Sequence, residues 1–164
     1  MIRFVKTGDA SAICAIYNHY IKHTVITFEE IPVSPEEMES RIQNISASYP
    51  WLVWEEEKSV LGYAYINKWK DRSAYNFSVE DSVYLKQGCE KQGIGRKLLT
   101  GLLEEARNAK VHAIVAGICI PNEPSVSLHE KLGFKKAAHF EQVGFKFNQW
   151  LDVGYWELLL PKAS

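Results

Sequence analysis

The chain has 164 residues, and 19 Lys and Arg against 20 Asp and Glu give a formal net charge of -1. Hydrophobic residues make up 46% and charged residues 24%, which supplies a packed core and excludes intrinsic disorder. The near-zero charge offers no basic surface for nucleic acid or for an anionic membrane. We expect one domain over residues 1–164, in which any binding of phosphate comes from a local site.

The N-terminus and the cysteines indicate where the protein works. Residues 1–6 lack the uncharged core of a signal peptide, and no window approaches the roughly 18 to 20 apolar residues of a membrane-spanning helix. Cys14, Cys89 and Cys119 are odd in number and lack a CxxC pair, which disfavours disulfides and a zinc site. His19 and His23 have metal-ligand spacing but no third ligand. We expect a soluble cytoplasmic protein without a metal.

The first half of the chain predicts a strand, two helices and a hairpin. A strand at residues 2–5 precedes apolar residues at helical spacing over 12–21, with Asp9 as the expected N-cap. Ser34-Pro35 begins a second helix, because Ser is a good N-cap and Pro suits the first helical position. Two β-rich runs within residues 51–67, separated by a polar turn, predict an antiparallel hairpin.

The second half predicts a strand, a glycine loop and a helix in succession. A strand within residues 76–85 leads to a helix that opens near Gly93, and a strand over 111–120 follows. A short helix over 125–132 and a final turn and strand within 144–160 complete the chain. The strand-helix-strand unit should be parallel and right-handed. The fold class is therefore α/β: a mixed central sheet, antiparallel in its first half, flanked by helices.

The glycine loop Gly93-Ile94-Gly95-Arg96 lies where a strand passes into a helix. Free backbone N–H groups and the helix dipole can bind a phosphate or pyrophosphate there. A Walker loop would need Gly-Lys-Ser/Thr, and a dinucleotide fingerprint would need a small residue at Leu98. A simple tight turn at a helix start explains the glycines equally well, and the neighbouring cations favour anion binding.

Two ordered motifs resemble one superfamily. Glu90-Lys91-Gln92-Gly93-Ile94-Gly95 resembles the Q/R-x-x-G-x-G/A coenzyme A signature of the GCN5-related N-acetyltransferases, with Glu90 in place of Gln or Arg. Residues 122–134 resemble the N-x-x-S-x-x-L-(Y/H)-x-x-x-G-(F/Y) segment of the same superfamily. More narrowly, residues 18–21, 49–53, 79–84 and 150–156 are similar to the branch of phosphinothricin and methionine sulfone or sulfoximine N-acetyltransferases.

The resemblance implies the N-acetyltransferase fold, acetyl-CoA as co-substrate and a homodimer. It implies transfer of acetyl to the amino group of a small amino-acid analogue. A cysteine could carry the acetyl group in a ping-pong mechanism, but none of the three lies in a recognisable Cys-His-Asp arrangement, so we expect direct transfer in a ternary complex. Other acceptors remain open, namely a polyamine, an aminoglycoside or a protein N-terminus, and so does a non-catalytic acyl-CoA sensor.

Two catalytic residues are expected. Glu80 lies in an apolar run where partial burial raises a carboxyl pKa, and the resemblance favours it as the base that deprotonates the amine. Strand alternation places the adjacent Asp81 on the opposite face. By the same resemblance, His129 protonates the departing thiolate or contacts the substrate. The alternatives are an ion-paired edge acid at Glu80 and a structural histidine at 129.

The remaining site residues are expected from the resemblance and from local charge. A small anionic substrate needs cationic partners, for which Arg72 is the first choice and a solvated loop charge the alternative. Residues 144–146 and Trp150 are expected to close the pocket. The coenzyme-binding residues are Val83, Tyr84 and Leu85, through their backbone, with Lys91, Gln92, Gly93, Ile94, Gly95, Arg96, Asn122 and Ser125, and the substrate-binding residues are Phe28, Lys70, Asp71, Arg72, Tyr75 and His129.

Overall fold

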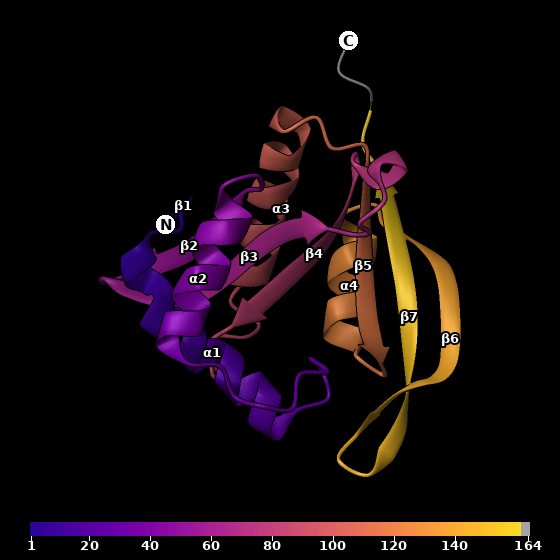
Figure 1. Cartoon of the computed structure of the whole chain (residues 1–164), viewed down its shortest axis with the longest axis horizontal. Coiled ribbons are helices and arrows are strands. Elements are labelled where there is room, and N and C mark those ends of the chain that lie inside the picture. Colours follow the sequence, from indigo (N-terminus) through magenta and orange to yellow (C-terminus); the bar gives the residue numbers. More distant parts are fainter. Residues whose placement is uncertain (162–164) are drawn as a thin grey trace.

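The computed structural model describes residues 1–161, which form a seven-stranded sheet in the order β1-β2-β3-β4-β5-β7-β6 (Figure 1). The β4–β5 pair is parallel and the other strand pairs are antiparallel. This confirms the expected mixed sheet. The strands are β1 (Ile2–Phe4), β2 (Trp51–Glu56), β3 (Ser59–Lys68), β4 (Ser78–Leu85), β5 (Ala113–Ile120), β6 (Lys135–Lys146) and β7 (Gln149–Leu159), and the helices are α1 (Ala10–His23), α2 (Pro35–Ser46), α3 (Ile94–Asn108) and α4 (Glu123–Lys131), with short 3-10 turns η1 (Thr7–Asp9) and η2 (Ser73–Tyr75).

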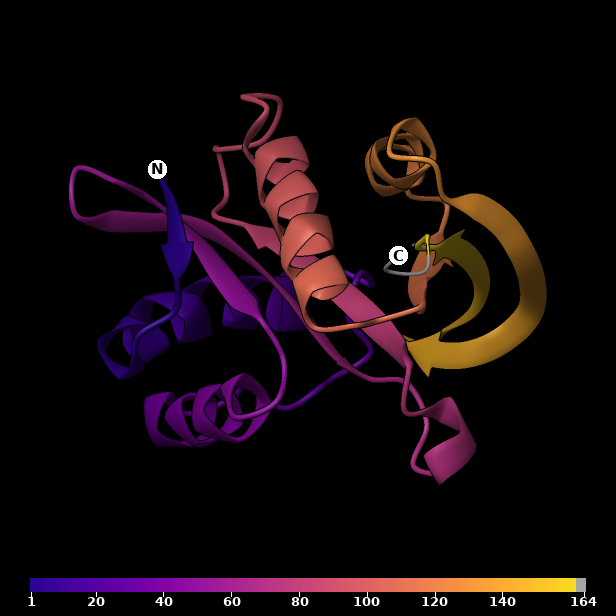
Figure 2. The same ribbon diagram turned by 90° about the horizontal axis from the view of Figure 1, so that it is seen from above.

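The helices cover both faces of the sheet, with α1 and α2 on one side and α3 and α4 on the other (Figure 2). On the α3 side, Leu98, Leu99 and Leu102 are fully buried against strand residues such as Ile66 and Ile114. Their spacing forms one apolar stripe along the helix, which is why α3 packs on the sheet. A second core lies under α1 and α2. Within residues 1–161, none of the helices is both long and apolar enough to cross a membrane.

Strands β4 and β5 pair only at their beginnings. Their ladder runs from Ser78 opposite Ala113 to Glu80 opposite Val115. Strand β4 then continues to residue 85 and β5 to residue 120 without further pairing to each other. Figure 1 shows the two ribbons diverging beyond this point. The sheet is therefore split along part of its central parallel pair.

The split leaves one edge of β4 open. Ser78 accepts and Lys86 donates a backbone hydrogen bond toward β3, so the even-numbered residues of β4 belong to the β3 ladder. The odd-numbered residues direct their N–H and C=O groups to the other edge. The Asp81 N–H still takes part in the last bridge to β5, so beyond it the Asp81 carbonyl and both backbone groups of Val83 face the space between the strands.

Strand β6 differs from the sequence-based expectation. Sequence analysis placed a final turn and strand within 144–160, which β7 confirms, but it assigned no strand to residues 135–143. Most residues of β6 are exposed, since it lies at the edge of the sheet. An edge strand with both faces in solvent has no alternation of apolar and polar residues, so the periodicity used to find strands is missing.

The two expected helix caps had different outcomes. Ser34 is the N-cap of α2, and its Oγ accepts the N–H of Glu37 at 3.1 Å, as expected. Asp9 precedes α1 but its side chain does not cap that helix. Its carboxylate accepts bonds from Arg3 at 2.7 and 2.8 Å and from the Lys6 N–H at 2.8 Å. Asp9 therefore holds η1 and strand β1 together.

The Ser34 cap gives a stability prediction. Replacing Ser34 by Ala should lower the free energy of unfolding by about 1 kcal/mol, because the Glu37 N–H loses its acceptor. Urea unfolding measures the change. The matched control is Ser40→Ala, an exposed position within α2, which should be neutral or slightly stabilising. Equal losses in the two variants would contradict the capping role.

Candidate active site

Glu80 lies where the β4–β5 ladder ends. Its side chain is close to Gly117 of β5 and Tyr155 of β7, since a Cβ built on Gly117 would be 3.1 Å from Glu80 Oε1 and 3.2 Å from Tyr155 Cε1. Burial raises the pKa of Glu80, the negative charge of Asp81 raises it further, and Lys70 opposes both. Such a carboxyl can accept a proton closer to neutral pH than an exposed one.

Asp81 and His129 form a buried pair on the opposite face. His129 Nε2 lies 3.0 Å from Asp81 Oδ2, and the two side chains are 6% and 1% exposed. His129 Nδ1 lies 2.7 Å from the carbonyl oxygen of Ser125. Burial lowers the pKa of His129, but the Asp81 carboxylate and the Ser125 carbonyl outweigh it, so the pKa is raised. Because strand alternation separates Asp81 from Glu80, His129 lies on the α4 side and not beside Glu80.

The N-terminus of α3 fits an anion. Gly93 is its N-cap, in the left-handed region at φ 77°, and no side chain caps the helix. The first intrahelical bond runs from the N–H of residue 97 to the Gly93 carbonyl. The N–H groups of Ile94, Gly95 and Arg96 are therefore free for a ligand.

Side chains of the glycine loop bind the loop itself. Glu90 Oε2 accepts the N–H of Gly88 at 2.8 Å, and Gln92 Nε2 donates to the Gly88 carbonyl at 3.3 Å. Lys91 has a positive φ of 62° and is exposed, as is Arg96. The unusual Glu90 thus holds the loop by accepting a backbone bond, and it leaves the helix N-terminus uncovered.

The expected backbone contacts of β4 divide by register. Val83 faces the open edge, whereas the backbone of Tyr84 belongs to the β3 ladder. The ring of Tyr84 lies edge-on to Tyr17 and Tyr20, with centroids 5.2 and 5.1 Å apart. The Tyr20 hydroxyl donates to the Leu85 carbonyl at 2.8 Å and accepts the Leu85 N–H at 3.3 Å. Tyr20 therefore occupies the outer end of the open edge.

Asn122 and Ser125 lie at the start of α4. Asn122 is the N-cap, and its Oδ1 accepts the Ser125 N–H at 3.3 Å. Its amide nitrogen is left to contact a ligand beside the helix. Since α4 directly follows β5, both residues lie on the far side of the split from β4.

The expected substrate residues lie at two different places. The segment 70–75 precedes β4, at the paired ends of β4 and β5. Its Lys70 is close enough for its charge to lower the pKa of Glu80. Asp71 is fully exposed, Arg72 is exposed, and Tyr75 lies edge-on to Trp69. Phe28 lies instead against Gly144 of β6, near the unpaired ends of the strands. The structure does not bring these residues together around one point.

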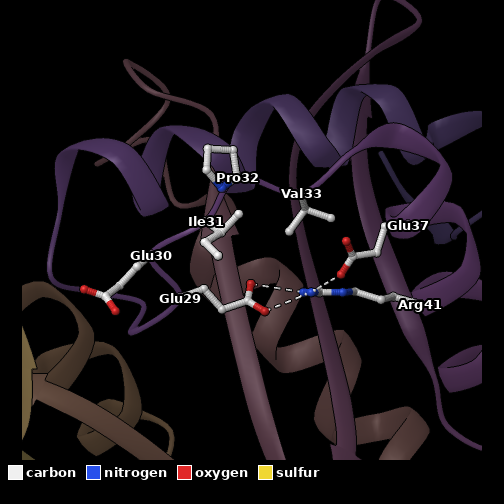
Figure 3. Close-up of a pocket in the computed structure, with 7 residues that line it drawn as sticks. All are labelled: Glu29, Glu30, Ile31, Pro32, Val33, Glu37 and Arg41. Atoms are coloured by element: carbon white, nitrogen blue, oxygen red, sulfur yellow. Dashed lines mark hydrogen bonds and ion pairs between the residues drawn. The ribbon is translucent and has the colours of Figure 1, made fainter.

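A hollow of about 400 Å³ lies beside the loop between α1 and α2 (Figure 3). In it, Arg41 of α2 is held between the carboxylates of Glu29 and Glu37. The pKa of Tyr65 is raised by burial, and it is also affected by the charges of Arg41, Glu29 and Glu80. The hollow therefore borders the face of the sheet on which Glu80 lies. Its lining residues are Glu29, Glu30, Ile31, Pro32, Val33, Glu37 and Arg41.

Comparisons with known proteins decide the family. Residues 2–154 match the family described as "Acetyltransferase (GNAT) domain". The chain belongs to the GNAT acetyltransferases. It is 38% identical to a phosphinothricin N-acetyltransferase of Streptomyces viridochromogenes, over 95% of this chain and 85% of that protein. It is 39% identical to an L-methionine sulfoximine/L-methionine sulfone acetyltransferase of Salmonella typhimurium, over 99% of this chain and 96% of that protein.

The fold agrees with that family. A Salmonella typhimurium protein solved with its cofactor acetyl-CoA superposes with a TM-score of 0.97 at 38% identity, covering 100% of this chain and 95% of that one. The expected GNAT fold and the expected acetyltransferase class are both confirmed. Within residues 1–161 of this acetyltransferase, no three His, Cys, Asp or Glu side chains cluster as metal ligands.

Sequence reasoning did not find three features of this acetyltransferase site. Gly117 gives room to Glu80 and Tyr155, Tyr20 occupies the backbone groups of residue 85, and Asp81 pairs with His129. A glycine within an apolar strand was the one available signal, because it often marks a close approach. The other two features join residues 65 and 48 positions apart.

Proposed function

We propose that this acetyltransferase transfers the acetyl group of acetyl-CoA to the amino group of a small amino-acid analogue, such as phosphinothricin, methionine sulfone or methionine sulfoximine. The observation that carries the proposal is Glu80, half-buried with a raised pKa at the point where β4 leaves β5. The names of relatives 38% and 39% identical to this chain supply the substrate class.

The coenzyme site joins a helix N-terminus to the open edge of β4. When bound there, acetyl-CoA supplies the acetyl group as a reactive thioester. The free N–H groups of α3 suit its pyrophosphate, and the backbone of Val83 can bond its pantetheine arm as a neighbouring strand would. The proposed coenzyme-binding residues are Val83, Lys91, Gln92, Gly93, Ile94, Gly95, Arg96, Asn122 and Ser125, whereas the backbone groups expected from Tyr84 and Leu85 are taken by β3 and by the Tyr20 hydroxyl.

Glu80 acts as the base. An amine is mostly protonated at neutral pH, so its nitrogen must lose a proton before its lone pair can attack the thioester carbonyl. Glu80 accepts that proton, directly or through a water molecule. As the new C–N bond forms, the C–S bond of the thioester would break, and the coenzyme would leave as a thiolate that takes its proton from solvent. Only the ionised carboxylate can do so, so activity falls as the pH drops through the raised pKa of Glu80.

The anionic part of the substrate needs a cation. Lys70 is the cation whose charge lowers the pKa of Glu80. Arg72 lies two residues further along the same segment. We assign Asp71 and Tyr75 to the outer wall of the substrate site on this segment, and Phe28, which lies against Gly144, to the opposite end of the opening. The three glutamates of the hollow around Arg41 favour a cationic amine such as a polyamine as the second candidate.

We further propose a cytoplasmic homodimer that confers resistance to toxic amino-acid analogues by blocking their amino group. The outer part of the β6–β7 hairpin supports the dimer, because its apolar side chains are half or more exposed. These side chains are Phe140, Val143, Phe145, Phe147 and Trp150.

The dimer can be tested by sedimentation velocity. The measured mass should be about twice the chain mass, and a monomer at micromolar concentration would contradict the dimer.

The first test combines Glu80→Gln with a substrate panel. The wild-type protein should release thiol from acetyl-CoA with methionine sulfone, methionine sulfoximine or phosphinothricin, and more slowly with ordinary amino acids and polyamines. Glu80→Gln should lower kcat by about 10² to 10⁴ and remove the acidic limb of the pH profile. The control Glu56→Gln changes an exposed strand-end carboxylate and should leave kcat unchanged. Coenzyme binding without turnover on any amine would instead favour a sensor.

A second prediction concerns Glu90. Replacing Glu90 by Gln should lower the Kd for coenzyme A about two- to fivefold at low salt, because it removes a negative charge near the pyrophosphate. The Gln oxygen can still accept the Gly88 N–H. Calorimetric titration measures the change, and Glu104→Gln, which changes an exposed carboxylate of α3, is the control. An unchanged Kd would show that Glu90 does not repel the coenzyme.

A further inference from the structure

The Asp81–His129 pair crosses the split in the sheet. Asp81 is the first residue of β4 beyond the ladder with β5. His129 is on α4, which follows β5 in the chain and packs beside it. The 3.0 Å contact between Asp81 Oδ2 and His129 Nε2 therefore joins the two halves of the molecule at the place where the strands part.

The contacts of the imidazole define its protons. The Ser125 carbonyl oxygen can only accept, so Nδ1 carries a hydrogen and donates it over 2.7 Å. Nε2 faces a carboxylate oxygen, and a hydrogen there gives a charge-assisted bond. With both nitrogens donating, the ring is an imidazolium paired to the Asp81 carboxylate. The raised pKa of His129 agrees with this state.

Asp81 is the charged group that contacts the ring. On α4 itself, Glu130 is exposed and accepts the indole N–H of Trp156 at 3.0 Å, and Lys131 is exposed. Glu80, one residue along β4, points to the opposite face of the sheet. Phe134 lies edge-on to the imidazole with ring centroids 5.0 Å apart. The ring is thus contacted by one carboxylate, one carbonyl and one aromatic ring, and the Ser125 hydroxyl lies 3.5 Å from Nδ1.

A proton donor to the thiolate needs a proton that it can release at low cost. If His129 gave up its Nε2 hydrogen, the Asp81 carboxylate would remain buried without its donor, which costs free energy. The Nδ1 hydrogen is committed to the Ser125 carbonyl in the same way. Both hydrogens are therefore structural.

We propose that Asp81 and His129 are positioning residues that brace β4 against α4, and that His129 is not the proton donor to the departing thiolate. The brace fixes the backbone of Asp81 and Val83, the open edge along which the coenzyme arm lies. The proposal rests on the proposed coenzyme site. It does not depend on the identity of the amine, because the binding titration and the NMR measurement need no acceptor substrate, and the kcat comparison can use any amine that is turned over.

The test compares wild type, Asp81→Asn, His129→Gln and the double variant in calorimetric titration with coenzyme A. Each single variant should weaken coenzyme A binding at least about tenfold, and the double variant should be no worse than the singles, because either change removes the same brace. Where binding persists, the acidic limb of the kcat profile, set by Glu80, should stay in place. A Kd within twofold of wild type together with a large fall in kcat would assign His129 as the acid and overturn the proposal.

A measurement on the unchanged protein covers the case in which a variant does not fold. Nitrogen-15 NMR of the imidazoles at pH 7.5 should show both nitrogens of His129 protonated, with slow exchange of both hydrogens with water. His112, on the loop before β5, is the internal comparison in the same spectrum. One protonated nitrogen on His129, or rapid exchange at Nε2, would overturn the brace. Absence of turnover on every amine would count against the proposed function and leave this result untouched.

Discussion

The organisation of the site depends on the early end of the ladder between β4 and β5. A parallel pair in the middle of a sheet normally satisfies its backbone groups along its whole length. Here pairing stops after three residue pairs, and the open edge of β4 is left with donors and acceptors that only a ligand, water or a side chain can satisfy. The Tyr20 hydroxyl does so at Leu85. The remaining stretch is an edge with unpaired backbone groups. Such an edge can bond an extended chain that contains amides, such as the pantetheine arm.

Strand alternation divides the two chemical tasks between the two faces. Glu80 and Asp81 are adjacent in sequence, so a regular strand must direct them to opposite sides. One side holds the carboxyl with a raised pKa, beside Gly117 and Tyr155. The other side holds the buried ion pair with His129, next to α4 and the free N-terminus of α3. In the proposed function, the amine and the coenzyme approach from opposite faces and meet in the opening between the strands.

Local features of the sequence were predictable and long-range ones were not. The Ser34 cap and the Gly93 turn depend on neighbours within four residues, so residue type and spacing were sufficient to find them. Glu80 could be selected because a carboxylate in an apolar run is unusual. The Asp81–His129 pair depends on how β4 and α4 pack together, and that is set by the whole fold. Phe28 and Arg72 were expected in one pocket from the resemblance and from the need for a cation, but Phe28 lies against Gly144 of β6 and Arg72 lies on the segment before β4.

The protonation state of Glu80 that favours folding differs from the state that the proposed activity needs. The pKa of Glu80 is raised in the folded protein, mainly by burial, so folding favours its protonated form. That contribution to stability is present below the ordinary carboxyl pKa and is lost as the pH rises through the raised value. As the proposed base, Glu80 accepts a proton only when ionised, which is the state that burial makes costly. His129 also has a raised pKa, so the stabilising charge of its pair with Asp81 persists above pH 6.5 and is lost only as the pH passes the folded-state value. The site can accept a proton and keep the charged pair only at a pH where Glu80 is ionised while His129 is still protonated.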